Sequence, residues 1–365
     1  MAEPLAQIIA QDVSVAADVA IAKSAQIRAY SVRIEEGAVI GEGVRLRAGS
    51  VHLGRGTQIC ADTSAFFVDS LEIGPFGFVD RECSLRGRSL RAGAHFYVGE
   101  RVTTGGGGAM GPRARLVAED AVSIFSETYV NLADHVTLGA GTALSSHVAI
   151  LTHGCWQSVL EGYPSAFAPV NVGRDVVVYF GSTVLPGCHI GDGTLVGANS
   201  LVNQPLPSGC LAAGNPVRII RENYPQKPSA ARLQSIALEV LQMYAEGLDY
   251  KGFENVHAAD LDQERELSFH YAGRPYRLVL DYAEAPQDEG TILIALSTSN
   301  PSVFPKNTRG PVAYFDLLSP SMSGHTDDVV EDVRDFLRRT GVRIMVDRPF
   351  RAIGPRALRD LPAFS

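Results

Sequence analysis

The most regular feature of the chain is a branched aliphatic residue at every sixth position late in its first 220 residues. The series is Val172, Val178, Val184, Ile190, Val196 and Val202. A spacing of six fits neither the 3.6-residue period of a helix nor the two-residue alternation of a single strand. It predicts a triangular coil of three short strands, six residues per side, in which the aliphatic side chain points inward.

The same spacing begins near the start of the chain and continues, with single-residue slips, to residue 150. Slips of this kind are tolerated because each coil packs only on its neighbours. The members of this earlier series are Ile9, Val15, Ile21, Ile27, Ile34, Ile40, Leu46, Leu53, Ile59, Ile73, Val79, Leu85, Val98, Leu132, Leu138, Leu144 and Ile150.

Two segments interrupt the register. Residues 105–108 are four consecutive glycines, which are costly to order, so we expect a mobile loop that leaves the coil. Residues 153–171 do not fit a multiple of six and contain the only tryptophan. We expect this aromatic loop to bind a ligand, since loops on rigid scaffolds often do; contact with a neighbouring subunit is the alternative.

The register ends near residue 221, and a proline-containing joint follows at 225–228. Helical spacing over 230–247 predicts a helix, which we expect to cap the open end of the coil and cover its strand edges. Beyond residue 250 the pattern predicts a hairpin at 267–282, strands at 291–296, 312–317 and 342–346, and a helix from residue 326. We therefore expect a coil domain (1–224), a capping helix (225–250) and a small α+β domain (251–365).

Composition narrows the partners of the protein. The formal net charge of −8 argues against nucleic acid as the main partner. Five cysteines without a paired spacing indicate reduced thiols, and no apolar run is long enough to span a membrane. We expect a cytoplasmic protein. Arginine is frequent from Arg28 to Arg115; we expect most of these side chains to be solvated, the alternative being that some face an anionic substrate.

The coils at the end of the series resemble a known family. The motifs are Val184-Leu185-Pro186-Gly187-Cys188-His189-Ile190-Gly191-Asp192-Gly193, Val196-Gly197-Ala198-Asn199-Ser200 and the closing Ala213-Gly214-Asn215-Pro216-Val217-Arg218. They are similar to those of the hexapeptide-repeat acyltransferases of the xenobiotic, galactoside and maltose acetyltransferase type. This resemblance implies a mainly β fold, a left-handed parallel β-helix, here followed by the helix and the α+β domain. It also implies a homotrimer with active sites in clefts between subunits.

Acyl transfer to a hydroxyl or amine needs a base for the acceptor's proton, and histidine commonly fills that role. His153, at the edge of the aromatic loop, resembles the family's catalytic histidine. His135 lies eighteen residues earlier, so we expect it beneath His153 if the register holds, as a supporting or structural residue. We expect Trp156, Tyr163 and Asn131 to contact the acceptor.

The resemblance also implies residues that hold coenzyme A. Ala198 matches the position whose backbone meets the pantetheine arm, and Arg218 and Arg221 match the basic residues that meet the phosphates. The chain departs from the family at Tyr179-Phe180-Gly181, where Trp-Ile-Gly is usual, and at Asn203-Gln204, where Thr-Lys is usual. These departures leave an altered donor pose or a different acyl donor open.

The sequence thus predicts a CoA-dependent acyltransferase that moves an acetyl group from acetyl-CoA to a hydroxyl of a sugar or similar small polar acceptor, with no metal. Three alternatives remain: an N-acetyltransferase acting on an amino sugar, a γ-carbonic-anhydrase-like zinc enzyme, and a non-catalytic trimeric scaffold. His135, His147 and His153 are close in sequence, but they lack that zinc family's Gly-His-x-x-x-x-His spacing.

Overall fold

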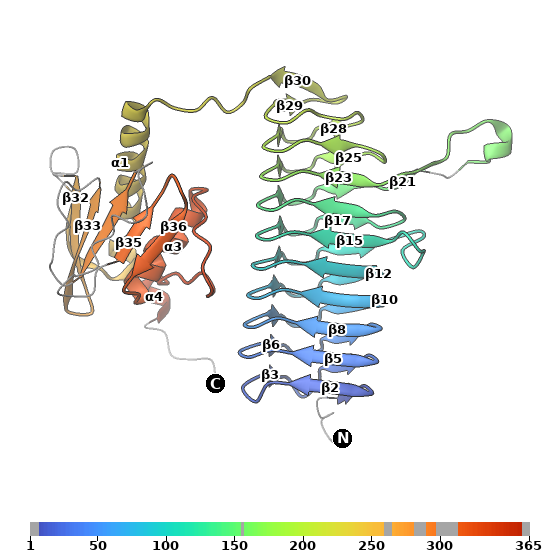
Figure 1. Cartoon of the computed structure of the whole chain (residues 1–365), viewed down its shortest axis with the longest axis horizontal. Helices are drawn as coiled ribbons and strands as arrows, with labels where there is room; N and C mark the ends of the chain where they lie inside the picture. The colour runs from blue at the N-terminus through green and yellow to red at the C-terminus, as the bar shows by residue number, and fades with distance from the viewer. Residues whose placement is uncertain (1–6, 155–156, 259–264, 281–289, 297–312, 360–365) are drawn as a thin grey trace. The chain divides into compact units, whose positions relative to one another are not determined.

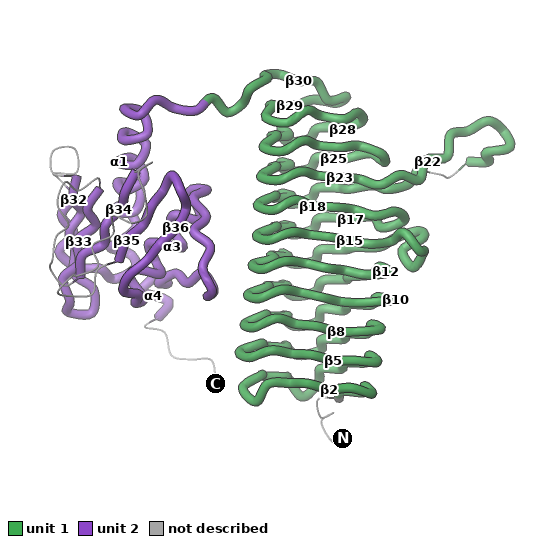
Figure 2. The backbone as a smooth tube through the Cα atoms, viewed as in Figure 1, with its two compact units in different colours: residues 1–226 green, residues 227–365 purple. Residues whose placement is uncertain are grey.

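A computed structural model describes residues 7–154, 157–258, 265–280, 290–296 and 313–359. The chain divides into two compact units, Met1–Gln226 and Lys227–Ser365 (Figure 2).

The first unit is a coil of short strands stacked in parallel, with three faces (Figure 1). The first face holds β1 (Gln7–Ile9), β4 (Gln26–Arg28), β7 (Arg45–Arg47), β14 (Thr103–Gly105), β17 (Tyr129–Asn131), β20 (Ala149–Ile150), β25 (Thr183–Val184) and β28 (Leu201–Val202). The second face holds β2 (Asp12–Val15), β5 (Ser31–Ile34), β8 (Ser50–Leu53), β15 (Arg115–Ala118), β18 (Val136–Leu138), β23 (Val170–Val172) and β26 (His189–Ile190). Two longer strands turn the corner and belong to both of these faces, namely β10 (Ser64–Ile73) and β12 (Ser84–Ala92).

The third face completes each coil and ends in one antiparallel pair, β29 with β30. It holds β3 (Ala20–Ile21), β6 (Val39–Ile40), β9 (Gln58–Ile59), β11 (Phe78–Val79), β13 (Tyr97–Val98), β16 (Ser123–Ile124), β19 (Ala143–Leu144), β24 (Val177–Val178), β27 (Leu195–Val196), β29 (Leu211–Ala213) and β30 (Arg218–Arg221).

The inward positions of the coil form one apolar core. From Ile27 to Val202, the aliphatic residues of the sixfold series are all buried, which confirms the mainly β, left-handed parallel β-helix expected from the sequence. At the first coil the predicted register is wrong by one residue: Ile8 pairs with the buried Ile27, whereas Ile9 pairs with the outward-facing Arg28 and is exposed. The predicted register is also wrong at a later coil, where Val130, not Leu132, pairs with Ile150, although Leu132 is also buried.

The aromatic segment after β20 leaves the coil, as the break in register predicts (Figure 1). It contains β21 (His153–Gly154), the 3₁₀ helix η1 (Val159–Glu161) and β22 (Ala166–Phe167). Strands β21 and β22 pair in antiparallel fashion and form the base of this segment.

Within its described residues, the second unit is an α+β module around a six-stranded sheet. Its elements are α1 (Ala230–Glu246), the 3₁₀ helix η2 (Asp249–Lys251), β31 (Glu254–His257), β32 (Glu266–Tyr271), β33 (Arg274–Leu280), β34 (Thr291–Ala295), β35 (Ala313–Asp316), β36 (Ser321–Gly324), α3 (Asp328–Arg339) and α4 (Arg356–Arg359). The hairpin, the strands after it and helix α3 lie close to their predicted ranges. Residues 342–346, predicted as a strand, are not one.

Helix α1 is present but differs from the expected separate cap. The side-chain oxygen of Ser229 accepts a hydrogen bond from the backbone N–H of Arg232 and so caps its N-terminus. Its buried residues, among them Leu241 and Tyr244, belong to the apolar core of the second unit. Helix α1 therefore packs as part of the second unit. No helix in the described residues is long and apolar enough to cross a membrane.

Candidate functional site

His153 lies where the chain leaves the coil, at the first residue of β21. Its imidazole is half-buried and stacks on the ring of Phe167, its partner in the β21–β22 ladder, with the ring centroids 5.6 Å apart and the planes at 21°. The aromatic segment that leaves the coil after β20, called the ejected segment below, therefore contacts one face of the histidine ring.

Asn131 holds the other side of the imidazole. It is the last residue of β17, and its Oδ1 lies 2.9 Å from Nδ1 of His153. Its Nδ2 donates to the carbonyl oxygen of Gly105 at 3.0 Å, and a carbonyl can only accept. The amide orientation is thereby fixed, so Nδ1 of His153 must donate to Oδ1. In the neutral ring Nε2 then carries the free lone pair.

This placement differs from the role predicted for Asn131. The sequence predicts that Asn131 contacts the acceptor, but its side chain is fully buried. Both ends of its amide bind groups of this chain, which makes Asn131 a positioning residue for His153.

Thr152 also holds the side chain of Asn131 in place. Its Oγ1 lies 2.6 Å from Oδ1 of Asn131 and accepts from the backbone N–H groups of Ala133 and Asp134 at 3.0 and 3.1 Å. Thr152 is fully buried. Satisfied buried hydrogen bonds of this kind hold side chains in one geometry.

The glycine segment at 105–108 packs against the site, which corrects the expectation of a loop that only leaves the coil. Gly105 is buried at the end of β14. A Cβ on Gly106, which has a φ of +94°, would lie 2.3 Å from Oη of Tyr129, so only glycine fits there. A Cβ on Gly107 would lie 3.4 Å from Nε2 of His153. The segment thus passes directly in front of the free imidazole nitrogen.

The other two histidines of the region are held elsewhere. Strand pairing of Tyr129 with Ala149 makes this coil longer than eighteen residues, so the prediction that His135 lies beneath His153 is wrong. Nδ1 of His135 instead lies 3.2 Å from Asp134. His147 is exposed, and its Nδ1 lies 3.4 Å from Glu127. Among the described residues no group of three or more His, Cys, Asp or Glu side chains could hold a metal ion.

The residues expected to hold coenzyme A lie on the last coils. Ala198 is exposed in the turn between β27 and β28, and a Cβ on the preceding Gly197 would lie 2.9 Å from Cβ of Ala213. Ala213 pairs with Arg218. The structure therefore brings the turn of Ala198 close to the exposed strand β30, which carries Arg218 and Arg221.

Two of the side chains that depart from the family motifs, Phe180 and Gln204, make contacts within this chain. The Phe180 ring meets the edge of the His147 ring at 4.9 Å, and Nε2 of Gln204 donates to the carbonyl oxygen of Val217 at 3.3 Å. Both side chains therefore contact this chain itself.

Tyr163 and Trp156 are the other two residues expected to contact the acceptor. Tyr163 is exposed on the ejected segment, whereas Trp156 lies outside the described residues. Sequence reasoning missed Thr152, Phe167 and Gly107 as parts of the site. Thr152 stands beside the predicted base, but only the three-dimensional pairing shows that the other two reach the imidazole.

We predict that Asn131→Ala lowers the free energy of unfolding by about 1–3 kcal/mol. The buried groups that donate hydrogen bonds to Oδ1 of Asn131 would lose their acceptor in this variant. Asn171→Ala is the matched control: Asn171 is half-buried, and its Oδ1 accepts from Thr137 at 2.7 Å. Urea unfolding of both variants measures the difference. Equal losses in the two variants would contradict the special place given to Asn131.

The comparisons with known proteins agree with the repeat. Residues 169–204 match the family described as bacterial transferase hexapeptide (six repeats). The Bacillus subtilis protein named "Putative acetyltransferase YvoF" is 32% identical over 104 residues, covering 28% of this chain and 56% of that protein. Galactoside O-acetyltransferase of Escherichia coli is 28% identical over 101 residues, covering 28% and 48%. The chain thus spans about half the length of these relatives.

A solved structure of similar type is the Vibrio cholerae hexapeptide-repeat acetyltransferase VCA0836 complexed with acetyl-coenzyme A. It is 21% identical, with a TM-score of 0.29, covering 34% of this chain and 70% of that one. The sequence matches confirm the resemblance to the hexapeptide-repeat acyltransferases: the last coils of this chain are built from the hexapeptide repeat of bacterial transferases.

Proposed function

We propose that this protein is a CoA-dependent O-acyltransferase that moves an acetyl group from acetyl-CoA to a hydroxyl of a sugar or similar small polar acceptor. The observation that carries the proposal is the imidazole of His153, whose Nδ1 is engaged by Asn131 at 2.9 Å while Nε2 faces the backbone of Gly107. This geometry leaves Nε2 able to accept a proton, which supports the proposal that His153 is the general base. The names of the matched relatives support acetyl transfer as the reaction.

The reaction needs one proton carrier and no covalent enzyme intermediate. Nε2 of His153 takes the proton of the acceptor hydroxyl as its oxygen attacks the thioester carbonyl. The tetrahedral intermediate then collapses, the carbon–sulfur bond breaks, and the proton passes to the coenzyme A sulfur. Asn131 stabilises the imidazolium by accepting from Nδ1–H throughout.

Direct transfer also agrees with the state of the cysteines. Burial raises the pKa of the Cys83 thiol to about 11, and burial raises the pKa of Cys188 as well. A thiol is a nucleophile only as the thiolate. Neither side chain is therefore suited to form an acyl-enzyme near neutral pH.

Coenzyme A is proposed to bind along the last coils. The exposed turn of Ala198 offers backbone groups to the pantetheine arm, and Arg218 and Arg221 offer guanidinium groups to the phosphates. Tyr163 and Trp156 are proposed to contact the acceptor from the ejected segment.

We predict that His153→Ala lowers turnover by about 10²–10⁴-fold, the range for a lost general base. Release of free thiol from acetyl-CoA in the presence of a sugar acceptor measures it. Coenzyme A affinity should stay nearly unchanged, because the proposed contacts lie at Ala198, Arg218 and Arg221. The same change at His147, which is exposed and contacts Glu127, is the control and should cost little.

A second variant tests the position of Nε2 without removing the histidine. Gly107→Ala places a methyl group about 3.4 Å from Nε2, at ordinary van der Waals distance, so the protein should fold normally and still lose turnover. Near-normal turnover in His153→Ala, or a loss in His147→Ala of the same size, would show that another group is the base.

We further propose that the protein is a homotrimer. Along the third face, the Phe78 ring stacks on Tyr97 with centroids 5.7 Å apart, and Tyr97 contacts Phe125 at 5.5 Å. Phe125 is exposed, as are Tyr179 and Phe180, which follow β24, whereas Phe78 and Tyr97 are half-buried. Exposed aromatic side chains of this kind are typical of surfaces that bind another protein.

We predict a sedimenting species of three times the 39.0 kDa chain mass. Analytical ultracentrifugation at several concentrations measures it. A monomer that retains full acetyltransferase activity would contradict both the trimer and active sites shared between subunits.

A further inference from the structure

An arginine row runs along the first face of the coil and leads to the proposed active site. Strand pairing places Arg28 opposite Arg47, Arg47 opposite Phe66, and Phe66 opposite Arg86. All three arginines point outward and are exposed. We refer to Arg28, Arg47 and Arg86 as the arginine row.

The row continues into the site that holds His153. A Cβ on Gly105 would lie 3.1 Å from Cβ of Arg86, and Gly105 pairs with Asn131 on the next coil. Successive strands lie about 4.8 Å apart, so the five steps from Arg28 to Asn131 span about 24 Å. The arginine row is therefore in line with the residue that positions the proposed base.

A hollow of about 800 Å³ follows the row. Besides the three arginines, it is lined by the exposed ring of Tyr30, by the ring of Phe66 and by Met110. Met110 follows the glycine segment that faces His153, so the hollow reaches the loop beside the site. Among the described residues that line it, none is acidic.

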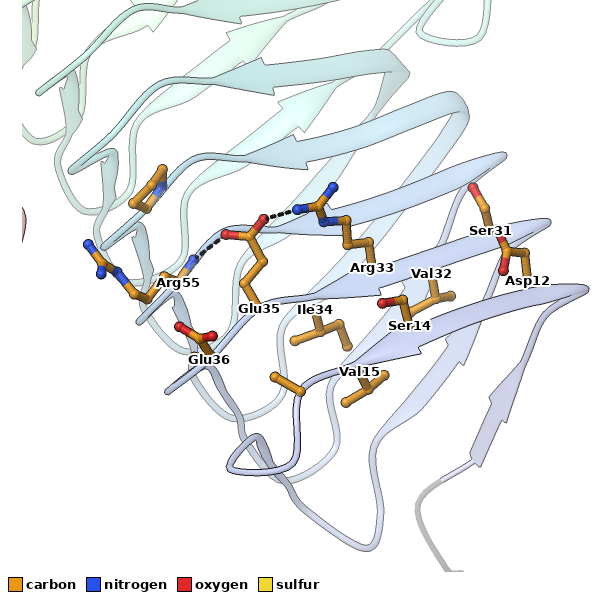
Figure 3. A pocket seen from close by; sticks show the side chains of 12 residues that line it. Asp12, Ser14, Val15, Ser31, Val32, Arg33, Ile34, Glu35, Glu36 and Arg55 are labelled. Carbon is orange, nitrogen blue, oxygen red and sulfur yellow. Dashed lines mark hydrogen bonds and ion pairs between the residues drawn. The ribbon is translucent and has the colours of Figure 1, made fainter.

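The second face of the coil differs from the arginine row, because two of its arginines have acidic partners. There Arg33 lies 2.9 Å from Glu35 and Arg91 lies 3.0 Å from Glu72. Figure 3 shows the hollow on that face, where Glu35 binds Arg33 and the backbone of Arg55, and a second carboxylate, Glu36, lies nearby. Arg33 and Arg91 of the second face are thus paired with carboxylates of this chain.

The arginine row has no such carboxylates. Within the described part of the chain, no ion pair joins Arg28, Arg47 or Arg86 to an acidic side chain. The guanidinium of Arg86 instead lies 5.9 Å from the centre of the Phe66 ring. Guanidinium groups aligned at strand spacing suit an extended ligand that carries repeated anionic groups.

From these contacts we infer that the acceptor is a linear oligosaccharide with carboxylate groups, bound along the arginine row with one end at His153. This inference rests on the proposed O-acetyl transfer. A glycan supplies the hydroxyl that the site acylates, and the rings of Tyr30 and Phe66 offer flat apolar surfaces for sugar rings.

Binding is tested with oligogalacturonides of two to eight residues and with neutral malto-oligosaccharides of the same lengths, by calorimetry without acetyl-CoA. Affinity should rise with length for the acidic series only. Arg47→Ala should weaken binding of the acidic octamer about tenfold or more, as for a lost charged hydrogen bond. Arg47→Lys should retain part of it, and Arg91→Ala, which removes the same charge from the second face, should change affinity less than twofold.

Three results would overturn the inference: equal binding of neutral and acidic octamers, unchanged binding in Arg47→Ala, or tighter binding of an eight-nucleotide oligothymidylate. Thiol release separates this inference from the proposed function. Acidic binding that depends on Arg47, without thiol release from any acceptor, refutes the transferase alone. Thiol release that depends on His153, with Arg47→Ala unaffected, refutes the acidic acceptor alone.

Discussion

Backbone pairing between successive coils is the interaction on which the rest of this structure depends. Each short strand of the first unit is too small to bury its apolar side chains alone, and the coils above and below supply the missing hydrogen bonds and contacts. The same pairing places outward residues in straight columns about 4.8 Å apart. Gly105 beside Asn131, and Arg28 beside Arg47, are products of that register. Site and acceptor surface are therefore consequences of one stacking rule.

The site itself depends on the buried amide of Asn131. Its Nδ2 is committed to the Gly105 carbonyl, so its Oδ1 can only face His153 and Thr152. Two segments that leave the regular coil then enclose the imidazole: Phe167 stacks on it, and Gly107 lies near Nε2. A rigid column thus orients the ring, while irregular segments shape the space in which an acceptor would bind.

The sixfold series predicts the fold well because most sides of the coil carry an inward aliphatic residue, as at Ile40 and Val178. Spacing alone cannot fix the register where a coil is lengthened, and for that reason it wrongly predicts His135 beneath His153. The four glycines indicate flexibility when read locally, yet Gly106 is required by contact with Tyr129, a residue from the next coil. The sequence also does not show which elements pack on helix α1. Its apolar stripe indicates that one side of the helix is buried, but not which residues bury it.

The most direct test of this account is the tautomer of His153, read by ¹⁵N NMR on protein labelled at histidine. The account predicts that the neutral imidazole carries its proton on Nδ1, donated to Asn131, and that Asn131→Ala removes this preference. A neutral ring protonated on Nε2 in the unmodified protein would contradict the account, because the nitrogen that faces Gly107 could then accept no proton.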